Sequence, residues 1–69
     1  MATEYDQFTA MLRRAGIGHG LRHDFNPEGV TVMVETDPDE TGRWWITEFC
    51  FNADGSLSDR LATYEGEEF

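Results

Sequence analysis

The sequence predicts an α+β domain in which one N-terminal helix packs on an antiparallel meander of three to four strands. Two observations lead to this prediction. The first 15 residues carry apolar side chains at helical spacing, and after them the apolar period changes to two, which is typical of strands. The segments that follow are separated by short turn sequences, so local connections suffice to join them. With 69 residues, the chain is expected to form one domain over residues 1–69.

The helix is expected over residues 3–15. Thr3 is a good N-cap, and Asp6, three residues later, forms an acidic variant of the capping box. Gly16 is expected to end the helix in the left-handed conformation that favours glycine. The apolar stripe that faces the sheet consists of Tyr5, Phe8, Leu12 and Ala15.

Four strands are expected over residues 17–26, 30–36, 43–52 and 57–65. The connections are a turn at 26–29, with proline second and glycine fourth, an acidic loop at 37–42 and a hairpin turn with an Asp-Gly pair at 52–56. Alternation along the strands then predicts the core, which is expected to comprise Phe8, Leu12, Ile17, Val32, Val34, Trp45, Phe49 and Phe51.

Trp44 and Ile46 alternate with the core residues and fall on the opposite face of the sheet, where no other element of this short chain is available to cover them. Two interpretations are open. They form an exposed contact patch, since aromatic residues are enriched at interface cores, or the sheet curls and half covers them.

Charge is the most informative feature for function. The chain has 14 acidic residues, five arginines and no lysine, for a formal net charge of −9. The excess lies in the second half, where residues 35–69 hold ten of the acids and two of the arginines. Such a chain repels nucleic acid and membrane surfaces and attracts basic proteins, above all those whose usual ligand is a polyanion. We therefore expect a basic nucleic-acid-binding protein or complex as the partner.

The single cysteine, Cys50, allows no intramolecular disulfide, which favours a reducing compartment. No apolar run approaches the roughly 20 residues that a membrane span requires. A cytoplasmic location is expected.

Acidic residues recur at turns and outward strand positions, so that a row of carboxylates along the sheet could imitate the phosphates of a duplex. The alternative is that they only keep the protein in solution. The expected partner-binding residues are Glu35, Asp37, Asp39, Glu40, Glu48, Asp54 and Trp44.

Residues 37–48 also match the spacing of the 12-residue EF-hand calcium loop. Asp37, Asp39 and Thr41 take the first, third and fifth positions of the loop, and Glu48 takes the twelfth. The match would make the chain a calcium-binding module. Its flanks read as strands instead of helices, however, and an extended segment would carry Glu48 away from the loop, so an acidic hairpin loop is favoured.

No pattern of residues predicts catalysis. Nothing in the sequence desolvates one carboxylate selectively, and no nucleophile stands in a recognisable triad context. His19 and His23 lie four apart, yet they could hold zinc with Cys50 only if the fold happened to bring all three together. The sequence predicts a protein that is not an enzyme and has no catalytic residues, metal or cofactor.

The layout resembles a group of known proteins. A capped helix of the form Tyr5-x-x-Phe8-x-x-Met11-Leu12-x-x-Ala15-Gly16-Ile17 precedes short strands and the segment Phe49-x-Phe51-Asn52-x-Asp54-Gly55-Ser56-Leu57. This is similar to small acidic αβββ proteins encoded by phages and mobile elements, among them anti-CRISPR and anti-restriction inhibitors, several of which are DNA mimics. The resemblance implies an inhibitor that blocks the nucleic-acid-binding surface of a host defence complex. A small dimeric accessory protein that associates through Trp44 and Ile46 is a further alternative.

Overall fold

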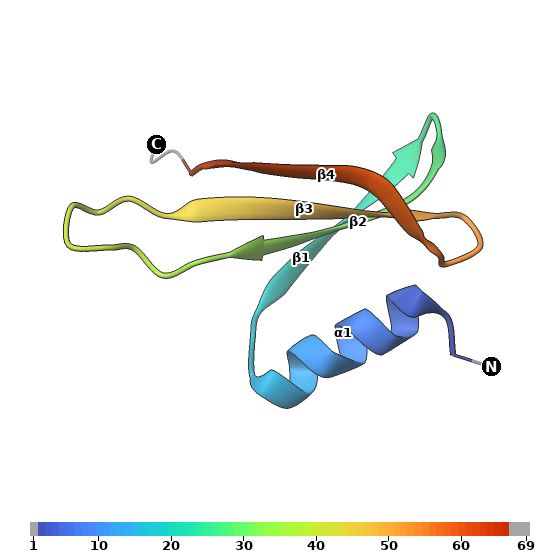
Figure 1. The fold of residues 1–69 in the computed structure, drawn as a ribbon, viewed down its shortest axis with the longest axis horizontal. Coiled ribbons are helices and arrows are strands. Elements are labelled where there is room, and N and C mark those ends of the chain that lie inside the picture. The colour runs from blue at the N-terminus through green and yellow to red at the C-terminus, as the bar shows by residue number, and fades with distance from the viewer. Residues whose placement is uncertain (1, 67–69) are drawn as a thin grey trace.

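The computed structural model describes residues 2–66 and has the predicted architecture, with one helix followed by a four-stranded antiparallel meander (Figure 1). Its elements lie close to the predicted segments. In chain order they are α1 Glu4–Ala15, β1 His19–Phe25, β2 Glu28–Glu35, β3 Trp45–Asn52 and β4 Leu57–Glu65. The strand order is β1-β2-β3-β4, so every strand pairs with its neighbours in sequence and β1 and β4 form the edges.

Both ends of α1 are fixed by the residues that the sequence indicates. The Thr3 hydroxyl accepts a hydrogen bond from the backbone N–H of Asp6 at 3.1 Å, and the Asp6 carboxylate accepts one from the N–H of Thr3, which completes the capping box. Gly16 ends the helix with φ = 73°. No helix among the described residues is long and apolar enough to cross a membrane.

The N-terminus of α1 is also tied to the β3–β4 turn. The N–H of Tyr5 donates to the carbonyl of Gly55 at 2.9 Å, and the carboxylate of Glu4 accepts a hydrogen bond from the N–H of Leu57 at 3.1 Å. These bonds satisfy backbone groups that a helix end and a turn would otherwise leave without partners. They place α1 against the end of the sheet that carries this turn (Figure 1).

The core lies where α1 crosses the sheet and is built around Phe51, which is 2% exposed. The Tyr5 ring meets the Phe51 ring edge-on, with centroids 5.5 Å apart, and Phe8 lies between Phe49 and Phe51 with centroid distances of 4.8 and 5.6 Å. Leu12 and Val32 complete this buried cluster. Aromatic packing of this kind gives a thin core much of its buried apolar area.

Two members of the expected core are not buried. Trp45 is 46% exposed and Ile17 is 43% exposed. Trp45 does lie on the face that α1 covers, by alternation with Phe49 and Phe51, but α1 ends before reaching it. Ile17 follows the Gly16 helix stop and precedes β1, so neither the helix nor the sheet encloses it. The other six residues of the expected core are buried or half-buried.

The expected turn at 26–29 is shorter than predicted, because Glu28 and Gly29 already belong to β2. Gly29 is buried and pairs with both Asp24 and Asn52. A Cβ atom at this position would collide with the backbone carbonyl of Phe51. This glycine therefore permits a close approach of two strands instead of a turn.

We predict that Phe51→Ala lowers the free energy of unfolding by about 3–5 kcal/mol, since it opens a cavity at the centre of the core. The matched control is Phe25→Ala, because Phe25 is 90% exposed and its loss should change stability by less than about 0.5 kcal/mol. Urea denaturation followed by circular dichroism measures both. Equal destabilisation by the two substitutions would contradict the position of the core.

Candidate protein-binding site

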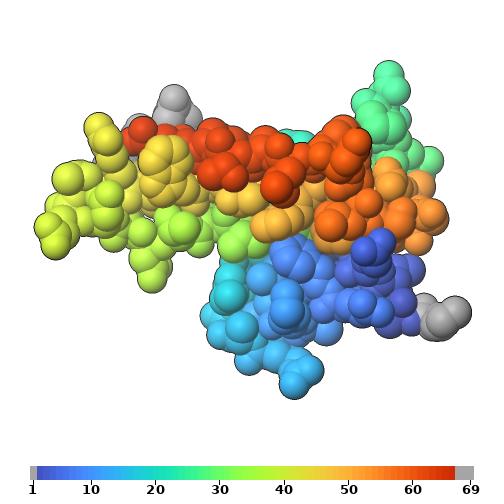
Figure 2. Space-filling model, viewed as in Figure 1, coloured from blue at the N-terminus to red at the C-terminus, as the bar shows by residue number. Residues whose placement is uncertain are grey.

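The β2–β3 hairpin projects past the C-terminal end of α1, and its connection, residues 36–44, forms one end of the molecule (Figures 1 and 2). The base of the connection is closed by two bonds between Thr36 and Trp45, in which the N–H of Thr36 donates to the Trp45 carbonyl and the N–H of Trp45 donates to the Thr36 hydroxyl, both at 2.9 Å. The sheet therefore continues into an ordered loop that α1, the one helix of the described chain, does not cover (Figure 1).

Asp39 organises this loop from within. One of its carboxylate oxygens accepts hydrogen bonds from the Thr41 hydroxyl at 2.6 Å, the Thr41 N–H at 2.8 Å and the Arg43 N–H at 3.0 Å. These bonds, the hydroxyl bond first, lower the pKa of Asp39 below its usual value. Gly42 closes the turn with φ = 81°, a conformation that other residues rarely adopt. One oxygen of Asp39 thus holds the loop in shape.

Three other carboxylates at this end remain free. Glu35, Asp37 and Glu40 are exposed, and within residues 2–66 none of them accepts a hydrogen bond or lies within 4.0 Å of an arginine. The nearest arginine in sequence, Arg43, is directed to Glu65 at 3.5 Å. The hairpin end is therefore a concentrated negative surface whose charges are not neutralised from within the described chain.

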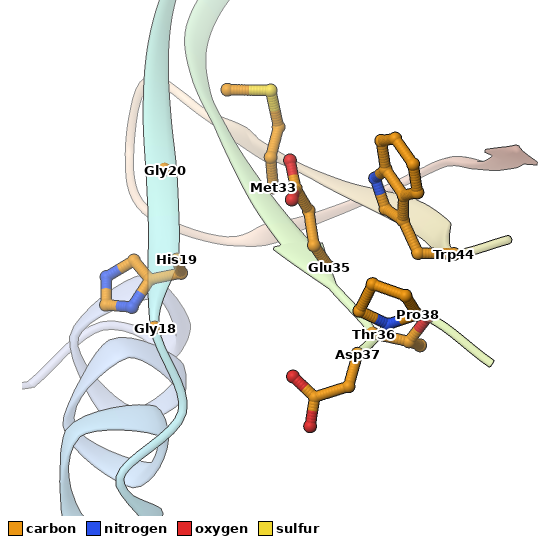
Figure 3. A pocket seen from close by; sticks show the side chains of 9 residues that line it. All are labelled: Gly18, His19, Gly20, Met33, Glu35, Thr36, Asp37, Pro38 and Trp44. Carbon is orange, nitrogen blue, oxygen red and sulfur yellow. The ribbon is translucent and has the colours of Figure 1, made fainter. Parts of the chain in front are cut away.

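Trp44 belongs to the same end of the molecule and is half-buried. It borders an open hollow of about 660 Å³, which lies between the start of β1 and the end of β2 on one side and Trp44 on the other (Figure 3). In Figure 3 the Glu35 carboxylate lies between the Met33 side chain and the Trp44 indole, and Pro38 lies below the indole. The complete lining is Gly18, His19, Gly20, Met33, Glu35, Thr36, Asp37, Pro38 and Trp44.

Gly66 packs against the indole ring of Trp44. The N–H of Gly66 donates to the Trp44 carbonyl at 2.9 Å, and a Cβ atom at Gly66 would collide with the indole ring. Ile46, its neighbour on the same face, is also half-buried. Trp44 and Ile46 therefore form no fully exposed patch, and the interpretation in which they are half covered is the closer one.

The last two expected partner-binding residues lie elsewhere. Glu48 is in the middle of β3, with its side chain 15% exposed, and binds Arg22 at 3.1 Å. Asp54 is in the β3–β4 turn at the far end of the sheet, where it accepts hydrogen bonds from the hydroxyl and N–H of Ser56 that lower its pKa. Of the seven expected residues, the structure brings together Glu35, Asp37, Asp39, Glu40 and Trp44 and separates Glu48 and Asp54 from them.

The sheet face opposite α1 carries a polar network that the sequence did not reveal. Thr31 is completely buried there, although no helix or strand of the described residues covers this face. Its hydroxyl donates to Asp24 at 2.6 Å and accepts a hydrogen bond from Arg22 at 3.3 Å, while Arg22 also binds Asp24 at 3.0 Å and reaches Glu48. Hydrogen bonding to Glu48, together with partial burial, raises the pKa of Tyr64. Long polar side chains thus shield this face.

The fold separates the residues of the suggested metal sites. Glu48 points to Arg22 on the open sheet face and does not close the 37–48 loop, and one oxygen of Asp39 is engaged by hydrogen bonds within the loop. His19 and His23 pair with Val34 and Val30 on the face toward α1, whereas Cys50 pairs with Thr31 on the other face. Within residues 2–66 no group of three or more His, Cys, Asp or Glu side chains could hold a metal ion.

Comparison of the chain with protein-family models, with curated proteins and with solved structures finds no match.

The pKa of Asp24 is lowered by the hydrogen bond from Thr31 and then by Arg22, so the charged carboxylate stabilises the folded state. A lowered pKa contributes stability that is complete above the unfolded value of about 3.9 and is lost as pH falls through the folded value. We predict that Asp24→Asn lowers stability at pH 7 and reduces its loss below about pH 4. Denaturation at several pH values measures this. Glu28→Gln is the control, since Glu28 is exposed; a pH dependence unchanged by Asp24→Asn would contradict the network.

We predict that Gly66→Ala displaces the Trp44 indole, because the added Cβ atom has no space. In a Trp45→Phe background, where Trp44 is the remaining tryptophan, its fluorescence should shift to longer wavelength as the ring becomes more exposed. Gly18→Ala is the matched control, since nothing lies within 4 Å of the atom that it adds. An unchanged spectrum in Gly66→Ala would show that Gly66 does not position the ring.

Proposed function

We propose that the protein is a non-enzymatic acidic interaction protein of the cytoplasm, which docks its hairpin end onto a basic, nucleic-acid-binding surface of a partner protein. One observation carries the proposal: the free carboxylates of Glu35, Asp37 and Glu40 lie on a projecting end that α1 leaves open (Figure 2), where Glu35 and Asp37 share a hollow with the half-buried Trp44. Within the described chain, no arginine lies close enough to pair with them.

Two physical features suit this surface to binding. Its carboxylates contribute to the formal charge of −9 of the whole chain, and a negative field of this kind steers a basic partner and accelerates encounter. The loop is also held in shape by the three hydrogen bonds to Asp39 and by the Thr36–Trp45 pair. A surface that is ordered before binding loses less conformational entropy on association.

The distribution of free carboxylates restricts the hypothesis that the acidic residues imitate the phosphates of a duplex. Glu48 and Asp54 are engaged within the protein, so the charges that remain free concentrate at one end of the sheet instead of forming a row along it. Such a patch can displace a short stretch of nucleic-acid backbone from its binding site. An inhibitor of a host defence complex, of the kind that phages and mobile elements encode, is the role that we propose for it.

Self-association is the second candidate, because Met11, Leu57 and Leu61 are 57%, 50% and 63% exposed near the unpaired edge of β4. An apolar hollow of about 350 Å³ lies between α1 and this side of the sheet. Two chains that each carry a formal charge of −9 would repel each other, however, and the bulge in β4 interrupts its edge. The docking of a basic partner is therefore favoured.

We predict that the protein captures a basic nucleic-acid-binding protein from the lysate of a host cell, and that duplex DNA competes for the same site. Capture should weaken steeply with salt, because the Debye length falls from about 10 Å at 0.1 M to about 3 Å at 1 M. The double variant Asp37→Asn/Glu40→Gln should slow association, since charges of this kind act mainly on the on-rate.

The matched control is Glu28→Gln/Asp59→Asn, which removes the same charge from exposed positions outside the hairpin end. It should bind nearly as well as the unchanged protein. Capture that is insensitive to salt and to DNA, or that falls equally in both double variants, would refute docking through the hairpin end.

A further inference from the structure

The hollow beside Trp44 has walls of two chemical kinds. Trp44, Met33 and Pro38 supply apolar surface, and Glu35 and Asp37 supply two carboxylates (Figure 3). The opposite wall includes Gly18 and Gly20, whose lack of side chains keeps this side open. Gly20 lies so close to Met33 that an added Cβ atom would be 3.3 Å from its terminal methyl group. An aromatic ring and carboxylates therefore border the same space.

This combination suits an organic cation. The face of an indole ring attracts a positive charge, and tryptophan does so more strongly than tyrosine or phenylalanine. Apolar walls lower the local dielectric and strengthen the attraction of a nearby carboxylate. A planar guanidinium group gains most from such a site, because it can stack on the ring and at the same time donate two parallel hydrogen bonds to one carboxylate. An ammonium group is a more strongly hydrated point charge and can do neither as well.

The arginines of the described chain are held away from the hollow. Arg22 binds Asp24 and Glu48, Arg43 reaches Glu65, and Arg60 donates to the Ser58 hydroxyl at 3.3 Å. Arg13 and Arg14 belong to the last turn of α1. None of the five lines the hollow, so the cation that it would accept comes from another molecule.

We propose that the hollow is a recognition site for an arginine side chain of the partner protein, with Trp44 stacking on the guanidinium group and Glu35 accepting its hydrogen bonds. Asp37 at the rim adds negative charge. The inference rests on the proposed function, since it assigns the basic partner one anchoring residue. It also goes beyond general charge attraction, because it requires arginine to be preferred over lysine.

The test uses short peptides, so it does not depend on identifying the partner. The probes are acetyl-Gly-Arg-Gly-amide, the same peptide with lysine, and the same peptide with citrulline, which keeps the shape of arginine and lacks its charge. Each is titrated into the ¹⁵N-labelled protein, and the indole N–H signal of Trp44, assigned with Trp44→Phe, is followed by NMR. The arginine peptide should shift this signal saturably, the lysine peptide should bind about threefold to tenfold more weakly, and the citrulline peptide should cause no shift.

Two substitutions with equal charge change provide the control. Glu35→Gln removes a carboxylate that lines the hollow, and Glu40→Gln removes one from the same hairpin end that does not line it. Glu35→Gln should weaken the arginine peptide about fivefold or more, and Glu40→Gln should have less than a twofold effect. Both side chains are exposed, so both variants should fold, which circular dichroism verifies.

Two results would overturn the arginine site. If Trp44 shows no saturable shift, the hollow binds no guanidinium group. If arginine and lysine bind equally and the two substitutions weaken binding equally, the hairpin end acts by charge alone. In either case the docking proposal is judged separately, by the salt dependence and DNA competition of partner capture.

Discussion

One short helix has to cover a much longer sheet. The 12 residues of α1 span about 18 Å at 1.5 Å per residue, while the molecule is 42 Å along its longest axis. Because hydrogen bonds from Tyr5 and Leu57 fix the start of α1 at the β3–β4 turn, the helix can bury only the Phe51 end of the sheet. Trp45 is left exposed on the same face, and the next position along this face holds a pair of threonines, Thr47 and Thr63, whose hydroxyls lie 3.2 Å apart. The hairpin end projects beyond α1, the one helix of residues 2–66 (Figure 1).

On the face away from α1, polar side chains cover the sheet in place of a helix. Arg22, Asp24 and Glu48 lie over Thr31 and exclude water from it, so that this threonine is buried without a second helix. The network also takes Glu48 out of the set of free carboxylates, as the Ser56 bonds do for Asp54. The short reach of α1 and of the polar network therefore determines both which part of the sheet is buried and where unpaired carboxylates remain. Free carboxylates remain at the hairpin end, which lies beyond α1 on one face and beyond the polar network on the other.

Local signals in the sequence were sufficient to predict the helix and the four strands. The capping box at Thr3, the stop at Gly16 and the period-two strands all appear as predicted, because each depends on neighbours in sequence. The extent of burial did not follow from alternation, which assigns Trp45 to a face but does not tell how far α1 reaches along it. For the site, the sequence located the acidic loop, whereas the engagement of Asp39 and Glu48 depends on hydrogen bonds within the loop and across strands that composition does not reveal. The hollow arises where residues from β1, β2 and the 36–44 loop meet, so it could not be predicted from any single segment.

The central claim is that the uncovered hairpin end is the binding surface. Backbone-amide NMR mapping of the ¹⁵N-labelled protein with its purified partner tests it most directly. The account predicts that signal changes concentrate in residues 35–44 and in the residues from Gly18 to Gly20 that face them across the hollow. Changes concentrated instead on α1 and β4, around Met11, Leu57 and Leu61, would contradict it and assign binding to the apolar side of the molecule.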